Sequence, residues 1–167
     1  MNVKVVKFGG SSLADAEQFK KVGSIIKSDT SRRFVVPSAP GKRFSGDTKV
    51  TDMLYSCYNA AQNGGDFDSV FAMVKYRFDS IIAGLGLSLD LSAEYEHIKW
   101  AILHHAGRDY AASRGEYLNG MILAEYLGYD FIDPADYIKF CDDGSFDAET
   151  TNGILSEEMK KHENGVI

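Results

Sequence analysis

The stretch VVKFGGSSL at residues 5–13 joins a β-branched run to two glycines, two serines and the start of an apolar-periodic segment. The run predicts a buried strand over residues 3–8, and the segment after it predicts a helix with Ser12 as N-cap. A second β-branched run, FVV, follows at 34–36. Strand, glycine-rich turn, helix and strand form a βαβ unit, whose strands pair in parallel. We therefore expect an α/β fold, with a mostly parallel central sheet and helices on both faces.

The rest of the chain predicts helices separated by polar loops, within a single domain over residues 1–167. Helices are expected over about 51–62, 66–84, 92–105, 109–127 and 150–162, and strands over 130–133 and 138–140. Trp100 is expected to face inward together with Ile98 and Ile102. A further apolar segment begins at 166–167, so we expect the natural chain to continue.

Composition excludes several classes of protein. The formal net charge of −6 argues against a nucleic-acid partner held by a broad basic surface. No apolar run is long enough to cross a bilayer, so no membrane partner is expected. Cys57 and Cys141 lie far apart without a CxxC pattern, which indicates reduced thiols in a cytoplasmic protein.

The first loop has the composition of an anion site. Amide groups at a helix start after a parallel strand attract phosphate or carboxylate, and Gly9 and Gly10 let the backbone approach closely. Lys7 places an ammonium group nearby. The alternative is a plain turn with a surface lysine. GGSSLA does not fit GxGxxG, and the lysine precedes the glycines, which excludes a P-loop.

Two later segments suit a small acidic ligand. The second strand ends at SAPG, residues 38–41, and the loop there leads to a helix start at 51–52. This loop and the glycine-rich loop leave the same edge of a parallel sheet, where the hydroxyls of Ser38 and Thr51 could bind a carboxylate. N-capping by Thr51 is the alternative. In SRGE at 113–116 a glycine interrupts a helical pattern, which indicates close approach of a ligand or a helix. A solvated ion pair is the other interpretation.

No metal site is predicted. His104 and His105 are adjacent and therefore point in different directions on a helix, without a suitably spaced carboxylate. The segment 142–149, DDGSFDAE, has its glycine misplaced for a calcium-binding loop, and a turn before a helix start explains it better.

Four motifs together resemble the N-terminal part of the aspartate kinases, within the amino acid kinase superfamily. These are KFGGSS at 7–12, SA at 38–39, TD at 51–52 and SRGE at 113–116. Their order and their placement on the predicted elements match that family. The resemblance covers essentially the whole chain, and KFGGSS is its most specific part.

The resemblance implies transfer of the γ-phosphoryl group of Mg-ATP to the side-chain carboxylate of L-aspartate, the first step of lysine, threonine and methionine synthesis. It implies that the ATP phosphates are bound by Lys7, Gly9, Gly10 and Ser11, with Lys7 catalytic. Ser38 and Thr51 would hold aspartate, and Glu116 would bind its α-ammonium group. No tightly bound cofactor is expected.

The same resemblance places further parts outside residues 1–167, namely the nucleotide-binding lobe and regulatory domains of the ACT type. It implies that the isolated chain turns over poorly and that the protein is a homo-oligomer. The loop at 40–50 is longer than in the simplest members of the family, which affects the transfer of a role to Thr51. Two alternatives remain: a kinase for glutamate or carbamate, and a non-catalytic ligand-binding module.

Overall fold

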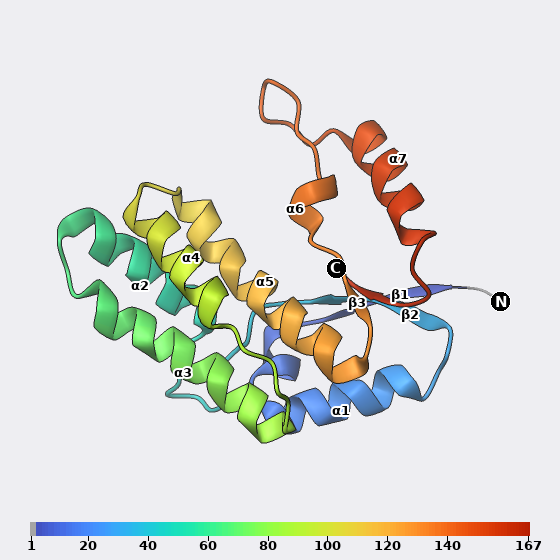
Figure 1. Ribbon diagram of the computed structural model, residues 1–167, viewed down its shortest axis with the longest axis horizontal. Helices are drawn as coiled ribbons and strands as arrows, with labels where there is room; N and C mark the ends of the chain where they lie inside the picture. Colours follow the sequence, from blue (N-terminus) through green and yellow to red (C-terminus); the bar gives the residue numbers. More distant parts are fainter. Residues whose placement is uncertain (1–2) are drawn as a thin grey trace.

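The computed structural model describes residues 3–167 and contains a four-stranded parallel sheet in the order β1-β2-β4-β3. The strands are β1 (Lys4–Phe8), β2 (Arg32–Pro37), β3 (Asp130–Phe131) and β4 (Gly165–Val166). The helices are α1 (Ala16–Lys27), α2 (Val50–Asn63), α3 (Phe67–Leu85), α4 (Ser92–Leu103), α5 (Arg108–Leu127), α6 (Pro134–Tyr137) and α7 (Ala148–Met159). Figure 1 shows α1 and α5 on one side of the sheet and α6 and α7 on the other. The predicted α/β class is confirmed.

The N-terminal βαβ unit forms as predicted, except at the start of its helix. β1 and β2 pair in parallel, with Lys7 opposite Val36. Ser12 lies within a short 3-10 turn over Gly10–Leu13 and is not an N-cap. The N-cap of α1 is Asp15, whose side chain accepts a hydrogen bond from the amide of Gln18 at 2.9 Å. The glycine-rich turn therefore extends further than the capping pattern indicated.

β1 is an edge strand of the sheet and is buried on one face only. Val6 and Phe8 pack against the core beneath the sheet. Because side chains alternate along a strand, Val5 and Lys7 lie on the opposite face, and Val5 is 58% exposed. The prediction of a buried strand is thus wrong for this face, because no helix of the described residues covers Val5 and Lys7.

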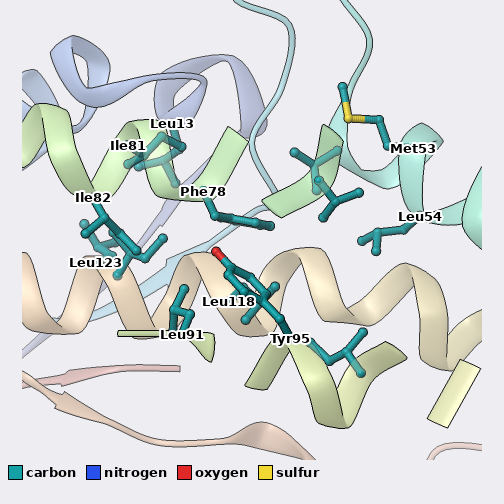
Figure 2. Packing of buried hydrophobic residues seen from close by; sticks show 14 of the residues in the cluster. Leu13, Met53, Leu54, Phe78, Ile81, Ile82, Leu91, Tyr95, Leu118 and Leu123 are labelled. Atoms are coloured by element: carbon teal, nitrogen blue, oxygen red, sulfur yellow. The ribbon is translucent and has the colours of Figure 1, made fainter. Parts of the chain in front are cut away.

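The largest apolar core lies between the helices. Phe78 and Ile81 of α3 face Leu118 and Leu123 of α5 (Figure 2), and all four side chains are buried. α2 packs against both α3 and α5, and α5 in turn contacts the sheet. This arrangement fixes the middle of α5, at Gly115 to Asn119, next to the end of β2. Within residues 3–167, no helix combines the length and apolar character needed to span a bilayer.

Two local predictions are wrong. Trp100 is 60% exposed and stacks on His104 of the next turn, with ring centroids 4.4 Å apart, because Ile98 and Ile102 occupy the buried face of α4. The segment 138–140 does not join the sheet. Phe140 instead forms an isolated antiparallel bridge with Phe146 in an exposed loop.

His162 connects the end of α7 to the sheet. Its Nδ1 lies 2.7 Å from a carboxylate oxygen of Asp130, and its Nε2 lies 3.0 Å from Glu158. These carboxylates, Asp130 first, raise the pKa of His162 above its usual 6.5. Since the folded pKa exceeds the unfolded one, the stabilisation is fully present below about pH 6.5 and is lost as the pH rises through the folded pKa.

We therefore expect His162→Gln to reduce stability more at pH 5.5 than at pH 8.5. Urea unfolding of the parent and the variant at both pH values measures this difference. An equal loss at the two pH values would contradict a role for the imidazolium form.

Candidate functional site

The loops after β1 and β2 cross at two glycines. The amide of Gly41 donates to the carbonyl of Gly10 at 2.8 Å, and the amide of Ser38 donates to the carbonyl of Phe8 at 3.0 Å. A Cβ at Gly10 would lie 2.6 Å from the carbonyl oxygen of Ala39, and one at Gly41 would lie 2.7 Å from the backbone of Gly10. Packing of one loop on the other therefore explains why Gly10 and Gly41 have no side chain.

Gly9 differs from Gly10 in its surroundings. A Cβ there would have no atom within 4 Å, and its backbone is extended at φ −77°. Neither packing nor conformation requires a glycine at this position. The open space in front of its backbone is where a ligand could approach the turn.

A cavity of about 520 Å³ opens at the carboxyl edge of β1 and β2. It is lined by Gly10, Ser11, Ser38, Ala39, Pro40, Gly41, Lys42, Lys49, Thr51 and Asp52. Four residues predicted for the site, Gly10, Ser11, Ser38 and Thr51, are thus brought together. With two lysines and one aspartate, the charged part of the lining favours an anion.

The hydroxyls of this cavity are free to bind a ligand. Within residues 3–167, the side chains of Ser11, Ser38 and Thr51 make no hydrogen bond to the protein. Thr51 does not cap α2, because the N-cap residue is Lys49 and it makes no capping side-chain bond. The alternative of N-capping by Thr51 is therefore wrong, and its hydroxyl remains available.

Lys7 lies outside this cavity lining. Its exposed side chain stands on the open face of β1, next to the last residue of the strand. It has no ion-pair partner among residues 3–167. The structure therefore places a free ammonium group near the carboxyl edge of the sheet, on the other side from the helical core.

Glu116 reaches the same edge from α5. Its Oε1 accepts a hydrogen bond from the amide of Ala39 at 3.2 Å. A Cβ at Gly115 would lie 2.7 Å from the Cβ of Ala39 and 3.3 Å from Leu54 of α2. The glycine of SRGE is thus explained by close packing of α5 on α2 and on the loop after β2.

Glu116 itself lines a second cavity of about 520 Å³, between α5 and α6. Arg114 lines this cavity too, with its guanidinium 4.6 Å and 4.7 Å from the ring centroids of Tyr110 and Tyr117. Burial, followed by a hydrogen bond to Glu94, raises the pKa of Tyr117 to about 12, so this ring stays neutral. Glu116 therefore lines the second cavity and is connected to the first through its hydrogen bond to Ala39, which lines that first cavity.

A buried ion pair holds the long loop at 41–49. Arg77 of α3 is 2% exposed and donates to the carbonyl of Gly41 at 2.9 Å, to Asp47 at 2.7 Å and to the carbonyl of Thr48 at 3.1 Å. Asp47 also accepts two side-chain bonds from Arg43, at 2.8 and 2.9 Å. Hydrogen bonding to Arg43, together with the charge of Arg77, holds the pKa of Asp47 well below its usual range. The loop also closes on itself, because the amide of Val50 donates to the carbonyl of Pro40 at 3.1 Å.

Sequence reasoning missed Arg77, Asp47, Lys49 and Asn119. A signal existed for Arg77, since it continues the inward stripe of Val74, Phe78 and Ile81 on α3. Asn119, three residues after Glu116, is fully buried and donates to the carbonyl of Ser38 at 2.7 Å. Among residues 3–167, no group of three side chains is arranged to hold a metal ion.

Fold and site together define an α/β protein with a cavity lined by hydroxyls and lysines at the carboxyl edge of a parallel sheet. The chain belongs to the amino acid kinase family, whose model matches residues 2–163.

Within that family the chain is similar to aspartate kinases. It is 46% identical to the aspartate kinase of Clostridium acetobutylicum, with a TM-score of 0.96. This match covers 100% of the present chain and 38% of the Clostridium acetobutylicum chain. It is 35% identical over 150 residues to aspartokinase 3 of Bacillus subtilis, which is 86% of this chain and 33% of the relative. Aspartokinase III of E. coli, solved with aspartate and ADP, shares the fold at 20% identity and a TM-score of 0.75, over 99% of this chain and 40% of that one. The chain thus spans between a third and two fifths of the length of these relatives.

Proposed function

We propose that residues 1–167 form the amino-acid-binding lobe of an aspartate kinase. The reaction transfers the γ-phosphoryl group of Mg-ATP to the β-carboxylate of L-aspartate, the first step of lysine, threonine and methionine biosynthesis. The observation that carries this proposal is the cavity at the sheet edge, where three hydroxyls without protein partners stand beside two lysines. The similarity to the Clostridium acetobutylicum enzyme supports it.

In this proposal the turn after β1 binds the phosphates. The open backbone of Gly9, the amide of Gly10 and the hydroxyl of Ser11 approach the phosphate oxygens. Lys7 neutralises the charge that spreads over the transferring group, and is the catalytic residue. Its lack of a protein partner supports this role, because no carboxylate of the described chain competes for the ammonium.

The loop after β2, the first turn of α2 and the middle of α5 bind aspartate. Ser38 and Thr51 donate hydrogen bonds to a carboxylate, and Glu116 accepts from the α-ammonium group. Glu116 uses one oxygen for the amide of Ala39, so its second oxygen is available to the substrate. An anionic substrate that also carries an amine needs such a single acceptor among donors.

The chemical step requires no covalent intermediate with the enzyme. A β-carboxylate oxygen attacks the γ-phosphorus, and the bond from that phosphorus to the bridging oxygen breaks as ADP leaves. The protein contributes positioning and charge neutralisation. Mg²⁺ enters with the nucleotide as part of the substrate, which agrees with a cavity lined by hydroxyls and lysines rather than by several carboxylates.

The remaining parts of the proposal concern the complete protein. The greater length of the relatives supports a nucleotide-binding lobe and ACT-type regulatory domains beyond this chain, and a homo-oligomeric enzyme in which the lobe alone turns over poorly. The free cysteines, Cys57 buried and Cys141 exposed, support a reducing cytoplasmic location.

The proposal is tested by measuring ADP formation by the complete gene product with L-aspartate, L-glutamate or carbamate as acceptor. We expect L-aspartate to exceed the others in kcat/KM by at least about tenfold, because Glu116 and the hydroxyls must engage both ends of the substrate. A preference for glutamate or carbamate would assign another kinase of the family. Tight binding of aspartate without ADP formation would instead indicate a non-catalytic module.

A matched pair of variants extends the same assay. Gly9→Ala should leave the melting temperature unchanged, since its Cβ meets no protein atom, yet it should raise the KM for ATP. Gly10→Ala should lower the melting temperature, because its Cβ would collide with the carbonyl of Ala39. An unchanged KM for ATP in Gly9→Ala would contradict phosphate binding at this turn.

A further inference from the structure

Helix α5 contacts the end of β2 through three of its residues. Gly115 lets the helix approach Ala39, and Glu116 accepts a hydrogen bond from the Ala39 amide. Asn119, one turn further along, donates from Nδ2 to the carbonyl of Ser38 at 2.7 Å. The carbonyl and the amide of one peptide group, the one between Ser38 and Ala39, are thus both held by side chains of a single helix at the candidate substrate site.

The amide of Asn119 is only half satisfied. Its side chain is fully buried, and its Oδ1 has no hydrogen-bond partner in the part of the chain that the structure describes. Its orientation is determined by chemistry, because the carbonyl of Ser38 can only accept and the NH₂ group must therefore face it. An unpaired buried oxygen of this kind destabilises a folded protein.

Stability alone therefore does not explain an asparagine here. Leucine has nearly the same shape and would fill the same space without an unpaired oxygen, at the cost of one unpaired carbonyl at Ser38. What only the amide supplies is a directional bond to that carbonyl. This bond fixes the peptide plane between Ser38 and Ala39, from which the Ser38 hydroxyl and the Ala39–Glu116 contact both extend.

We propose that Asn119 is a positioning residue for the amino-acid substrate, which it never touches. Through the Ser38 carbonyl it orients the Ser38 hydroxyl toward one end of the substrate and Glu116 toward the other. This inference rests on the proposed function, since it assigns those two groups to the amino acid. It predicts a larger effect on amino-acid binding than on nucleotide binding, because Asn119 bonds directly to the loop after β2 and reaches the turn after β1 only through that loop.

The test uses Asn119→Leu in the complete gene product, with Ile122→Leu as control. Ile122 is equally buried, lies one turn further along α5, and this substitution conserves volume. We expect Asn119→Leu to melt within about 3 °C of the parent, to raise the KM for aspartate at least about fivefold, and to leave the KM for ATP within about twofold. The control should change neither KM.

A second variant, Asn119→Asp, supplies a pH signature that a structural role would not produce. Burial raises the pKa of the new carboxyl, and only its neutral form can donate to the Ser38 carbonyl. The KM for aspartate should therefore approach the parent value at low pH and rise as the carboxyl ionises. A KM profile parallel to that of the parent would overturn the proposal.

Two results of the leucine variant would also overturn the proposal. One is a KM for aspartate within about twofold of the parent. The other is a large fall in melting temperature with a similar loss in all kinetic constants, which would show a structural role.

Amide hydrogen exchange at Ser38 and Ala39 separates this inference from the proposed function. If the parent forms no ADP from aspartate, the proposed function fails. In that case, exchange accelerated at least about tenfold by Asn119→Leu at unchanged melting temperature supports positioning of this peptide. Unchanged exchange overturns it.

Discussion

Replacing Lys7 with alanine in the complete gene product should lower the kcat for aspartate-dependent ADP formation by about 10²- to 10³-fold. The ammonium group of Lys7 is exposed at the end of β1 and has no ion-pair partner among residues 3–167, so its charge is available for the transferring phosphoryl group. The KM for aspartate should change little, because the groups assigned to aspartate lie on the loop after β2 and on α5. Steady-state kinetics at saturating ATP measure both constants.

The matched control is Lys4→Ala on the same strand. Lys4 forms an ion pair with Asp29 at 2.7 Å at the other end of β1, so its loss should leave kcat unchanged. Lys7 does not line the cavity that contains Ser11 and Ser38, so its role in the reaction depends on this comparison of Lys7→Ala with Lys4→Ala. A factor of ten in kcat corresponds to about 1.4 kcal/mol of activation free energy. A kcat of Lys7→Ala within about threefold of the parent value would therefore show that Lys7 does not take part in the reaction.

Replacing Arg77 with methionine should lower the free energy of unfolding by about 3–5 kcal/mol. The substitution leaves Asp47 buried with only Arg43 as partner, and leaves the carbonyls of Gly41 and Thr48 without their donor. Urea denaturation at pH 7 measures the loss. The loop at 41–49 should also become more accessible to proteases, because its attachment to α3 is gone.

Two further variants identify the cause. Arg77→Met combined with Asp47→Leu should recover much of the loss, since the buried carboxylate that has lost its buried partner is removed. Arg43→Met should cost only about 1 kcal/mol, because Arg43 is partly exposed and Arg77 still neutralises Asp47. A loss below about 1 kcal/mol in Arg77→Met would show that the ion pair does not hold the loop.

The local patterns of the sequence predicted most of the fold. The βαβ unit and the helices that became α2, α3 and α5 depend on nearby signals: apolar periodicity, and glycines that end a helix. Gly64, Gly86 and Gly128 all adopt a positive φ of 68–70° at helix ends. The errors arose where the structure of a segment depends on the elements that pack beside it. The triplet at 138–140 has strand-like residues but does not join the sheet, and one face of β1 is exposed because no helix of the described residues covers Val5 and Lys7.

The residues of the candidate site also fall into a group that the sequence predicts and a group that it does not. Ser11, Ser38 and Thr51 could be placed together because parallel strands bring successive loops to one edge. The groups that hold those loops could not be predicted, because their partners are distant in sequence. Arg77 bonds to Asp47, thirty positions earlier, and Asn119 bonds to Ser38, eighty-one positions earlier. Side chains of this kind look like ordinary helix residues until the chain is folded.

The backbone bond between Pro40 and Val50 makes the intervening segment an appendage whose two ends meet. Residues can be added to or removed from its exposed tip at 44–46 at small entropic cost, as long as Gly41 and Asp47 keep their bonds to Arg77. Ser38 and Thr51 then keep their mutual distance. Length variation confined to this tip is a poor guide to substrate choice, and the tip is a suitable place to graft foreign sequence.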